Sequence, residues 1–319
     1  MMKKLSFVLL MTLLLGTVLY SASWANENPN IRLGVMRFLS RAEGVTDKQA
    51  EAIGDIFARM LANSKAITVV ERDRLDEIAN EHQLLKEGRF EDEAVIELGK
   101  LMSCQYMLLG AVTNLERRTK ETDLWLISEK HQEVFTTLDI RVVDVTTSKI
   151  ILSFSESGSA SQKGSGFNFY GFQTNDNNFT GIEIPAIVEA VSRAGFKIRE
   201  TYGNEYAQVI DVSAKEITIN AGEDWGINAG ALFEIYSEGA EVFNIDGTSM
   251  GKKRNPLALV KVTSVQKDFC VAEAVKNGGR ASNVRKGNKI RSVTQKEAED
   301  LKKNVFSSKA KTGSSKKKK

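Results

Sequence analysis

Residues 31–40 read IRLGVMRFLS, residues 67–88 read ITVVERDRLDEIANEHQLLKEG, and residues 93–114 read EAVIELGKLMSCQYMLLGAVTN. Together these stretches decide the fold. Short runs rich in branched residues at Ile31–Phe38 and Ile67–Val70 predict buried strands. Tyr106–Leu109 is a third apolar run, closed by Gly110. The sequence therefore predicts strands that alternate with helices, in a βαβαβ order.

Helix signals fill the intervals between these strands. Thr46 can cap a helix, and Gln49 three residues later completes a capping box. A second helix is expected from Asp73 to a stop near Gly88, and a third over Glu93–Met102. The first helix carries apolar residues at helical spacing, which predicts one buried face: Ile53, Ile56, Phe57, Met60 and Leu61.

The same ordered elements resemble a known family. VVER (69–72), ExxLL (81–85), Leu98-Gly99 and QYMLLGAVT (105–113) resemble the curli production assembly/transport component family, CsgG and HfaB. The resemblance continues through LDIRVVDVTTSKIILSFS (138–155) and covers about Ile31 to Tyr202. It implies an α/β domain whose signature residues are Glu71, Arg72, Gly99 and Gly110.

We interpret these four signature residues as structural. Glu71 would favour the following helix dipole, and Arg72 would pair with a neighbouring acid. Gly99 inside a helix would allow close packing against the sheet. Gly110 would permit a turn or bulge at a strand end.

The pattern changes near residue 205 to short strands separated by Gly, Asn and Asp. ITINAGEDWGINAGALFEIY (217–236) and VRKGNKIR (284–291) resemble the C-terminal barrel of the flagellar assembly protein FlgT. The expected fold class is therefore an α/β (α+β) N-terminal domain, with a mixed sheet and flanking helices, followed by a small all-β, barrel-like domain. The expected units are a signal peptide at 1–25, the CsgG-like domain at 26–205, the β domain at 206–293 and a Lys-rich disordered tail at 294–319.

The first 25 residues predict export. Lys3 and Lys4 precede an apolar core, and small residues Ser23 and Ala25 mark a cleavage site before Asn26. No Cys precedes Cys104, so the lipidation cysteine of the lipidated family members is missing. We expect a periplasmic protein (the outer membrane-bounded periplasmic space), with outer-membrane association left open.

Charge bears on the partners. The chain has a net charge of +3, but two lysines lie in the leader and eight in residues 301–319, which leaves −7 for residues 26–300. A mildly acidic body does not favour a nucleic-acid partner. Protein partners of the envelope are expected, with self-association into a ring and peripheral membrane contact left open.

The family resemblance also implies an alternative function, a membrane pore. Two hairpins per subunit line the pore of curli transporters, and the matching segments here are 113–135 and 157–181. The first is crowded with charges, which are costly on a lipid-facing strand. The second carries an aromatic stretch that we interpret as a contact site: Phe167, Phe169, Tyr170 and Phe172.

Catalytic and metal motifs are weak. The GTSMG stretch at 247–251 fits a nucleophile elbow around Ser249, but a β-turn is favoured because both His82 and His131 precede it. No metal site is expected from two histidines and two cysteines without a CxxC pair. Cys104 and Cys270 are interpreted as buried apolar residues.

The sequence thus favours an exported, non-enzymatic cell-envelope protein without a cofactor, which acts in assembly or docking during secretion or surface-structure biogenesis. Two alternatives remain. One is a pore-forming outer-membrane secretion subunit of the curli-transporter type. The other is an envelope hydrolase with an unrecognised carboxylate site.

Overall fold

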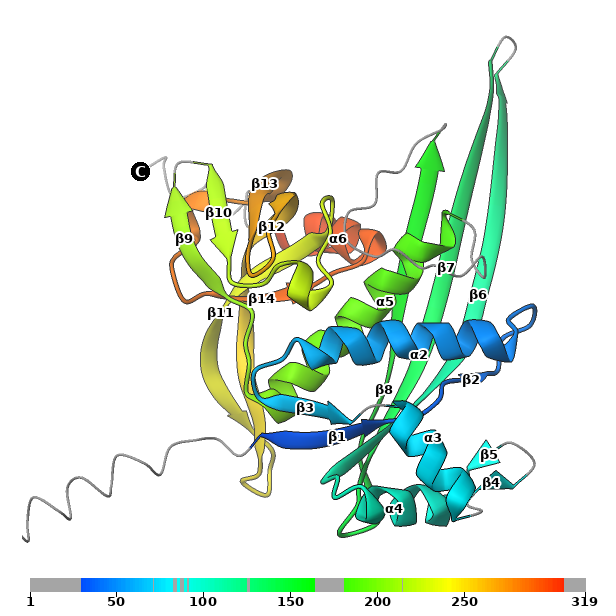
Figure 1. Ribbon diagram of the computed structural model, residues 1–319. Helices are drawn as coiled ribbons and strands as arrows, with labels where there is room; N and C mark the ends of the chain where they lie inside the picture. The colour runs from blue at the N-terminus through cyan, green and yellow to red at the C-terminus, as the bar shows by residue number, and fades with distance from the viewer. Residues whose placement is uncertain are drawn as a thin grey trace, which may run out of the picture.

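In the computed structural model the chain builds two six-stranded sheets, which are joined through a long helix (Figure 1). The structure describes residues 30–70, 72–82, 85–86, 89–90, 92–124, 127–163, 181–213 and 215–306.

The first sheet has the order β3-β1-β6-β7-β8, and β2 pairs with β6 beside the end of β1. Leu33 of β1 lies between Val69 of β3 and Tyr106 of β6 in parallel register. The other two strands run antiparallel, so the predicted mixed sheet is confirmed. Its strands are β1 (Ile31–Val35), β2 (Leu39–Ser40), β3 (Ile67–Val70), β6 (Tyr106–Leu124), β7 (Ile127–Asp144) and β8 (Lys149–Lys163).

Helices cover the sheet unequally. α2 (Asp47–Ala62) and α5 (Glu183–Ile198) bury one face in a core that includes Phe57, Leu108 and Ile140. α3 (Arg72–Glu81) and α4 (Asp92–Leu101) pack on the opposite face around Met107, the neighbour of Leu108. Because successive strand residues point to opposite faces, one apolar strand serves both cores. The predicted capping box of Thr46 and Gln49 is present at α2.

The second predicted helix is shorter than expected. α3 ends at Glu81, and the chain then pairs β4 (Leu85–Lys86) with β5 (Arg89–Phe90). Leu85 therefore belongs to a strand and not to the helix that was predicted to run to Gly88.

β6 and β7 form the longest hairpin among the described residues and project beyond the helices (Figure 1). Their pairing continues from Tyr106–Asp144 to Leu124–Ile127, with a register shift between Val112 and Asn114. β8 continues beside β7 as far as Lys163. The first domain thus carries a three-stranded arm.

The second sheet is antiparallel throughout, in the order β14-β11-β12-β13-β10-β9. One isolated bridge, between Gln208 and Lys289, links its two end strands. The all-β domain is confirmed, but the sheet does not close into the barrel that was expected. Its strands are β9 (Val209–Ser213), β10 (Glu216–Ile219), β11 (Leu232–Phe243), β12 (Ser249–Val265), β13 (Cys270–Gly279) and β14 (Lys289–Ser292), with short helical turns at η3 (Glu223–Trp225) and η4 (Ala281–Asn283).

The two domains share a buried contact. Phe196 of α5 lies 4.8 Å from Trp225 and 6.0 Å from Phe233, measured between ring centroids. Ser192 donates a hydrogen bond of 2.7 Å to the Gly226 carbonyl. After α5 the chain makes a π-helical turn, η2 (Arg199–Gly203), and enters the second sheet.

The predicted disordered tail requires a correction at its start. Residues 295–306 form α6 (Gln295–Leu301) and η5 (Lys302–Phe306), and Phe306 is buried. Thr294 and Glu297 form a capping box that starts the helix. The buried Phe306 and the capped helix start stabilise this segment, although its lysine-rich composition predicted disorder. Residues 307–319 lie outside the described part.

Candidate functional site

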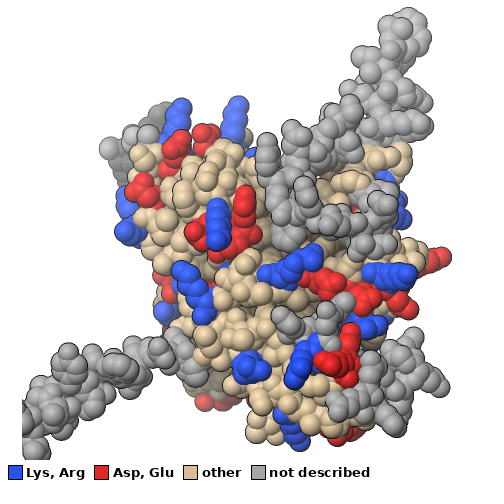
Figure 2. Space-filling model, in the orientation of Figure 1, with Lys and Arg blue, Asp and Glu red and all other residues tan. Residues whose placement is uncertain are grey.

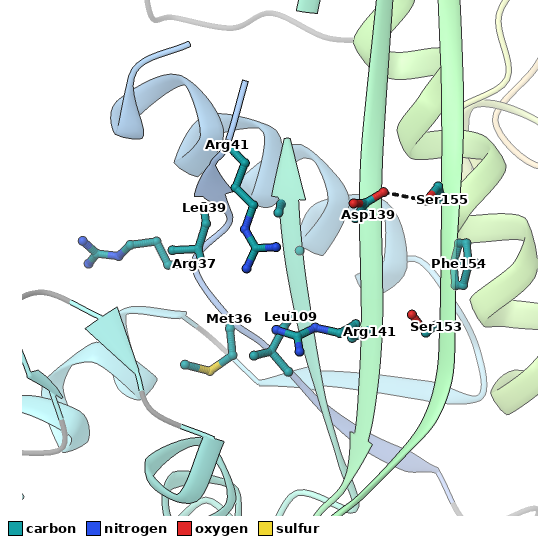
Figure 3. Close-up of a pocket in the computed structure, with 12 residues that line it drawn as sticks. Met36, Arg37, Leu39, Arg41, Leu109, Asp139, Arg141, Ser153, Phe154 and Ser155 are labelled. Atoms are coloured by element: carbon teal, nitrogen blue, oxygen red, sulfur yellow. Dashed lines mark hydrogen bonds between the residues drawn. The ribbon is translucent and has the colours of Figure 1, made fainter. Parts of the chain in front are cut away.

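A hollow of about 440 Å³ opens on the face of the first sheet that carries α3 and α4 (Figure 3). It extends from β2 across β6 and β7 to β8. Residues that point away from the α2–α5 core line most of it. The lining comprises Met36, Arg37, Leu39, Arg41, Leu109, Gly110, Ala111, Asp139, Arg141, Ser153, Phe154 and Ser155.

Two arginines extend into this hollow from opposite sides. Arg41 follows β2 and is positioned by its backbone N–H, which donates to the Val112 carbonyl at 2.9 Å. Arg141 lies on β7, opposite Ser153 of β8. Figure 3 shows the Arg141 guanidinium beside Leu109 and the Arg41 side chain reaching toward the same space from the β2 side. Among the described residues, neither arginine has a carboxylate within 4.0 Å.

Arg37 and Asp139 are the other charged groups of the hollow. Asp139 accepts a hydrogen bond of 2.6 Å from the Ser155 hydroxyl. Arg37 pairs with Asp76 at 2.8 Å and with Glu51 at 3.5 Å, and the hydrogen bond to Asp76 raises the pKa of Arg37. Arg37 therefore ties the β1–β2 connection to α2 and α3, whereas Arg41 and Arg141 form no ion pair with a described residue.

The two glycines of the family signature allow close packing: Gly110 against the β1–β2 connection, and Gly99 of α4 against the sheet. A Cβ on Gly110 would lie 2.2 Å from the Phe38 ring, and one on Gly99 would lie 2.6 Å from Val145. The expected turn or bulge is absent at Gly110, because β6 continues to Leu124. Glu71 lies outside the described residues. Arg72 begins α3, but its side chain is not described.

The aromatic contact candidates Phe167, Phe169, Tyr170 and Phe172 all lie outside the described residues. Sequence reasoning missed a different apolar surface, at the end of the β11–β12 hairpin. We call it the apolar tip, and it consists of four exposed side chains: Val242 (47 %), Phe243 (58 %), Ile245 (105 %) and Met250 (70 %). Its sequence signal is VFNI (242–245) directly before a turn.

The GTSMG stretch belongs to this hairpin, which confirms the predicted turn. Asn244 donates a backbone hydrogen bond to the Thr248 carbonyl at 2.8 Å, and Ser249 begins β12. The Ser249 hydroxyl donates to Glu241 at 2.6 Å. A nucleophile elbow requires a strand followed by a helix, whereas here strand follows strand.

Metal and thiol chemistry gain no support from the described residues. Among them, no group of three His, Cys, Asp or Glu side chains is placed to hold a metal ion. Both cysteines are free and buried, as predicted, and burial raises the pKa of Cys270 to about 12. A thiol with a raised pKa is a poor nucleophile at neutral pH.

The charges exposed on the face in Figure 2 are mixed in sign, with acidic and basic side chains side by side. No described helix combines the length and apolar character that a membrane crossing would require.

Comparison with known families agrees with the fold. The model described as "Curli production assembly/transport component CsgG" matches residues 29–206, more than half of the chain. The chain belongs to the CsgG family. A second model, "Flagellar assembly protein T, C-terminal domain", matches residues 214–284. Both resemblances expected from the sequence are therefore confirmed.

Solved structures resemble parts of this CsgG-family chain. The LpoB C-terminal domain from Escherichia coli is 16 % identical, with a TM-score of 0.30, over 42 % of this chain and 87 % of its own. Lipoprotein GNA1162 from Neisseria meningitidis is 14 % identical, with a TM-score of 0.31, over 43 % of this chain and 87 % of its own. The PelC dodecamer from Paraburkholderia phytofirmans is 14 % identical, with a TM-score of 0.24, over 51 % of this chain and 84 % of its own. These values are too low to transfer a function, and no curated protein matches the chain.

Proposed function

We propose that this protein is an exported, non-enzymatic component of envelope assembly, which docks other proteins during secretion or surface-structure biogenesis. The observation that carries the proposal is the apolar tip on the β11–β12 hairpin. The CsgG-type domain would be the assembly module, and the β domain would supply a second contact surface.

The tip is presented by ordered backbone. Glu241 pairs with Lys252 and Phe243 pairs with Ser249, so the two strands remain joined to their ends. Ile245 is 105 % exposed and contributes nothing to the protein's own core. Apolar side chains gathered at an exposed place commonly mark a contact with another protein or a membrane. This arrangement supports docking.

The three-stranded arm favours the pore alternative on length alone. β6, β7 and β8 contain 19, 18 and 15 residues, which exceeds the 9–11 residues or so that a membrane-crossing strand needs. Its composition favours docking, because Glu116, Arg117 and Arg118 follow one another on β6 and are at least partly exposed. Lipid-facing charges cost about 2–4 kcal/mol each near the bilayer centre.

Fractionation of cells that express the full chain distinguishes the two functions. A docking component should be released from the envelope by high salt or alkaline carbonate, whereas a pore subunit should require detergent. Intact-mass measurement should also show a mature chain that begins at Asn26. A protein that stays in the cytoplasm, or that only detergent releases, would contradict the proposal.

A tip variant then tests the carrying observation. Replacing Val242, Phe243, Ile245 and Met250 by Ser should reduce retention in the envelope or self-association in sedimentation, with an unchanged Tm. The matched control replaces Leu101 and Phe269, which are 43 % and 39 % exposed elsewhere, by Ser. Equal retention and self-association of wild type, tip variant and control would remove the tip as a contact surface.

A further inference from the structure

The arginine-lined hollow carries two cations that form no ion pair with a described residue. Arg41 and Arg141 reach it from segments 100 residues apart, and Figure 3 shows their guanidinium groups turned toward the same space. Arg37, by contrast, is taken up by Asp76 and Glu51. Two like charges that converge in a concave site repel each other, and a bound anion would relieve that repulsion.

A carboxylate suits these donors better than a cation or a neutral group. A guanidinium presents its N–H groups in a planar fork, which matches the two oxygens of a carboxylate or phosphate. The acid at the site, Asp139, already accepts from Ser155. The hydroxyl of Ser153, opposite Arg141, adds another hydrogen-bonding group.

The other half of the hollow is apolar. Met36, Leu39, Leu109 and Ala111 form it, and Leu39 is 36 % exposed. Since neighbouring strands lie about 4.8 Å apart, the distance from β2 to β8 over three strand spacings is about 14 Å. An extended peptide rises about 3.3 Å per residue, so about four residues would span the site. The lining thus fits a short segment in which acidic and apolar side chains alternate.

We infer that this hollow binds an acidic, apolar peptide segment of a partner protein, with a carboxylate held between Arg41 and Arg141. The inference rests on the proposed docking function and names the chemistry of one docked partner. The carboxylate is the recognised group, and the apolar half of the hollow selects peptide over a free inorganic anion.

The test uses the purified full chain and two fluorescein-labelled peptides, Leu-Asp-Leu-Glu-Leu and its amide counterpart Leu-Asn-Leu-Gln-Leu. Fluorescence anisotropy at low ionic strength should show binding of the acidic peptide and at least about tenfold weaker binding of the amide peptide. Arg41→Gln and Arg141→Gln should each weaken binding of the acidic peptide about tenfold or more, because each removes a charge-assisted hydrogen bond.

Arg59→Gln is the matched control, because Arg59 is exposed on α2 away from the hollow and carries the same charge. It should bind the peptide as wild type does. Arg41→Lys and Arg141→Lys keep the charge and should show intermediate affinity, since an ammonium lacks the planar fork.

Three results would overturn the inference. One is equal affinity for the acidic and amide peptides. Another is wild-type affinity in both glutamine variants. The third is competition by inorganic phosphate that exceeds competition by sodium chloride of the same ionic strength, with the unlabelled acidic peptide no better than phosphate. None of these results alters the fractionation or tip experiments, so failure here and failure of the docking function are distinguishable.

Discussion

The guanidinium of Arg199 lies over the indole ring of Trp225, with its central carbon 4.5 Å from the ring centroid, although the two residues belong to different domains. The same guanidinium donates to the Met60 carbonyl at 2.7 Å and to the Asp224 carbonyl at 2.8 Å. Arg199 is 1 % exposed, and its ion-pair partner Glu205 lies 3.7 Å away. One buried cation therefore joins α2, η2 and η3, and holds the CsgG-type and FlgT-type domains together.

Replacement of Arg199 by Met should lower the free energy of unfolding by about 3 kcal/mol. The change removes the Arg199 donor from the Met60 and Asp224 carbonyls and leaves the Glu205 carboxylate without its ion-pair partner. Loss of one partner of a buried pair is strongly destabilising. Urea denaturation would measure the loss. Arg59→Met, at an exposed position of α2, should stay within about 0.5 kcal/mol of wild type. A loss below about 1 kcal/mol for the Arg199 variant would show that the contact does not couple the domains.

The stability of the protein should depend on pH through Glu200, the residue after Arg199. Burial raises the pKa of its carboxyl above the ordinary value of 4.5, and nearby Lys289 and Arg254 lower it only in part. Because the pKa of Glu200 is higher in the folded state than in the unfolded state, its protonated carboxyl contributes to the stability of the fold. This contribution is complete below the unfolded-state pKa and is lost as the pH rises through the folded-state pKa. Glu200→Gln cannot ionise, so its stability advantage over wild type should grow from pH 4.5 toward pH 7.

Chemical denaturation across this pH range measures the difference. The exposed Glu223→Gln serves as control and should follow the wild-type profile. Parallel profiles for wild type and the Glu200 variant would contradict the prediction.

Gly110→Ala should destabilise the first domain by about 1–3 kcal/mol, because the new methyl group overlaps the Phe38 ring and the core must shift. Gly181→Ala is the matched control, since no atom lies within 4 Å of its added Cβ. In the Gly110→Ala background, Phe38→Leu should cost less than it does in wild type, because the smaller side chain relieves the overlap. Thermal unfolding of the four combinations gives this coupling, and additive losses would show that the ring and the glycine are independent.

The sequence predicted those parts of the fold that local patterns determine. The capping box at Thr46 and the apolar spacing from Ile53 to Leu61 lie within one helix, and the structure reproduces both. The outer half of the β11–β12 hairpin was missed because it buries neither face: beyond Tyr236 most of β11 is exposed. Alternation of apolar and polar residues identifies a strand only where one face is buried.

The candidate site could not be predicted for a different reason. Arg41 and Arg141 carry no shared local signal, and strand pairing alone brings them to one hollow. The start of α6 could have been found, because Thr294 and Glu297 have capping-box spacing. The high lysine content of the residues that follow led to the prediction that all of 294–319 is disordered.

The C-terminal residues Gln295–Phe306 pack against the rest of the protein. Phe306 is 7 % exposed and packs with Leu259, Val293 and Ala298, and a Cβ on Gly279 would lie 2.9 Å from its ring. Glu297 of α6 pairs at 3.2 Å with Arg193 of α5 and with Arg291 of β14. The C-terminal helix therefore contributes apolar burial and ion pairs to both domains.

A chain that ends at Phe306 should keep the wild-type Tm, because it loses only residues 307–319. A chain that ends at Val293 should lose at least the 3–5 kcal/mol or so that removal of a buried phenylalanine costs, and Phe306→Ala alone should show most of that loss. Urea denaturation of the three proteins measures these differences. If the chain that ends at Val293 is as stable as the one that ends at Phe306, α6 and η5 do not support the fold, and the tail begins at residue 294.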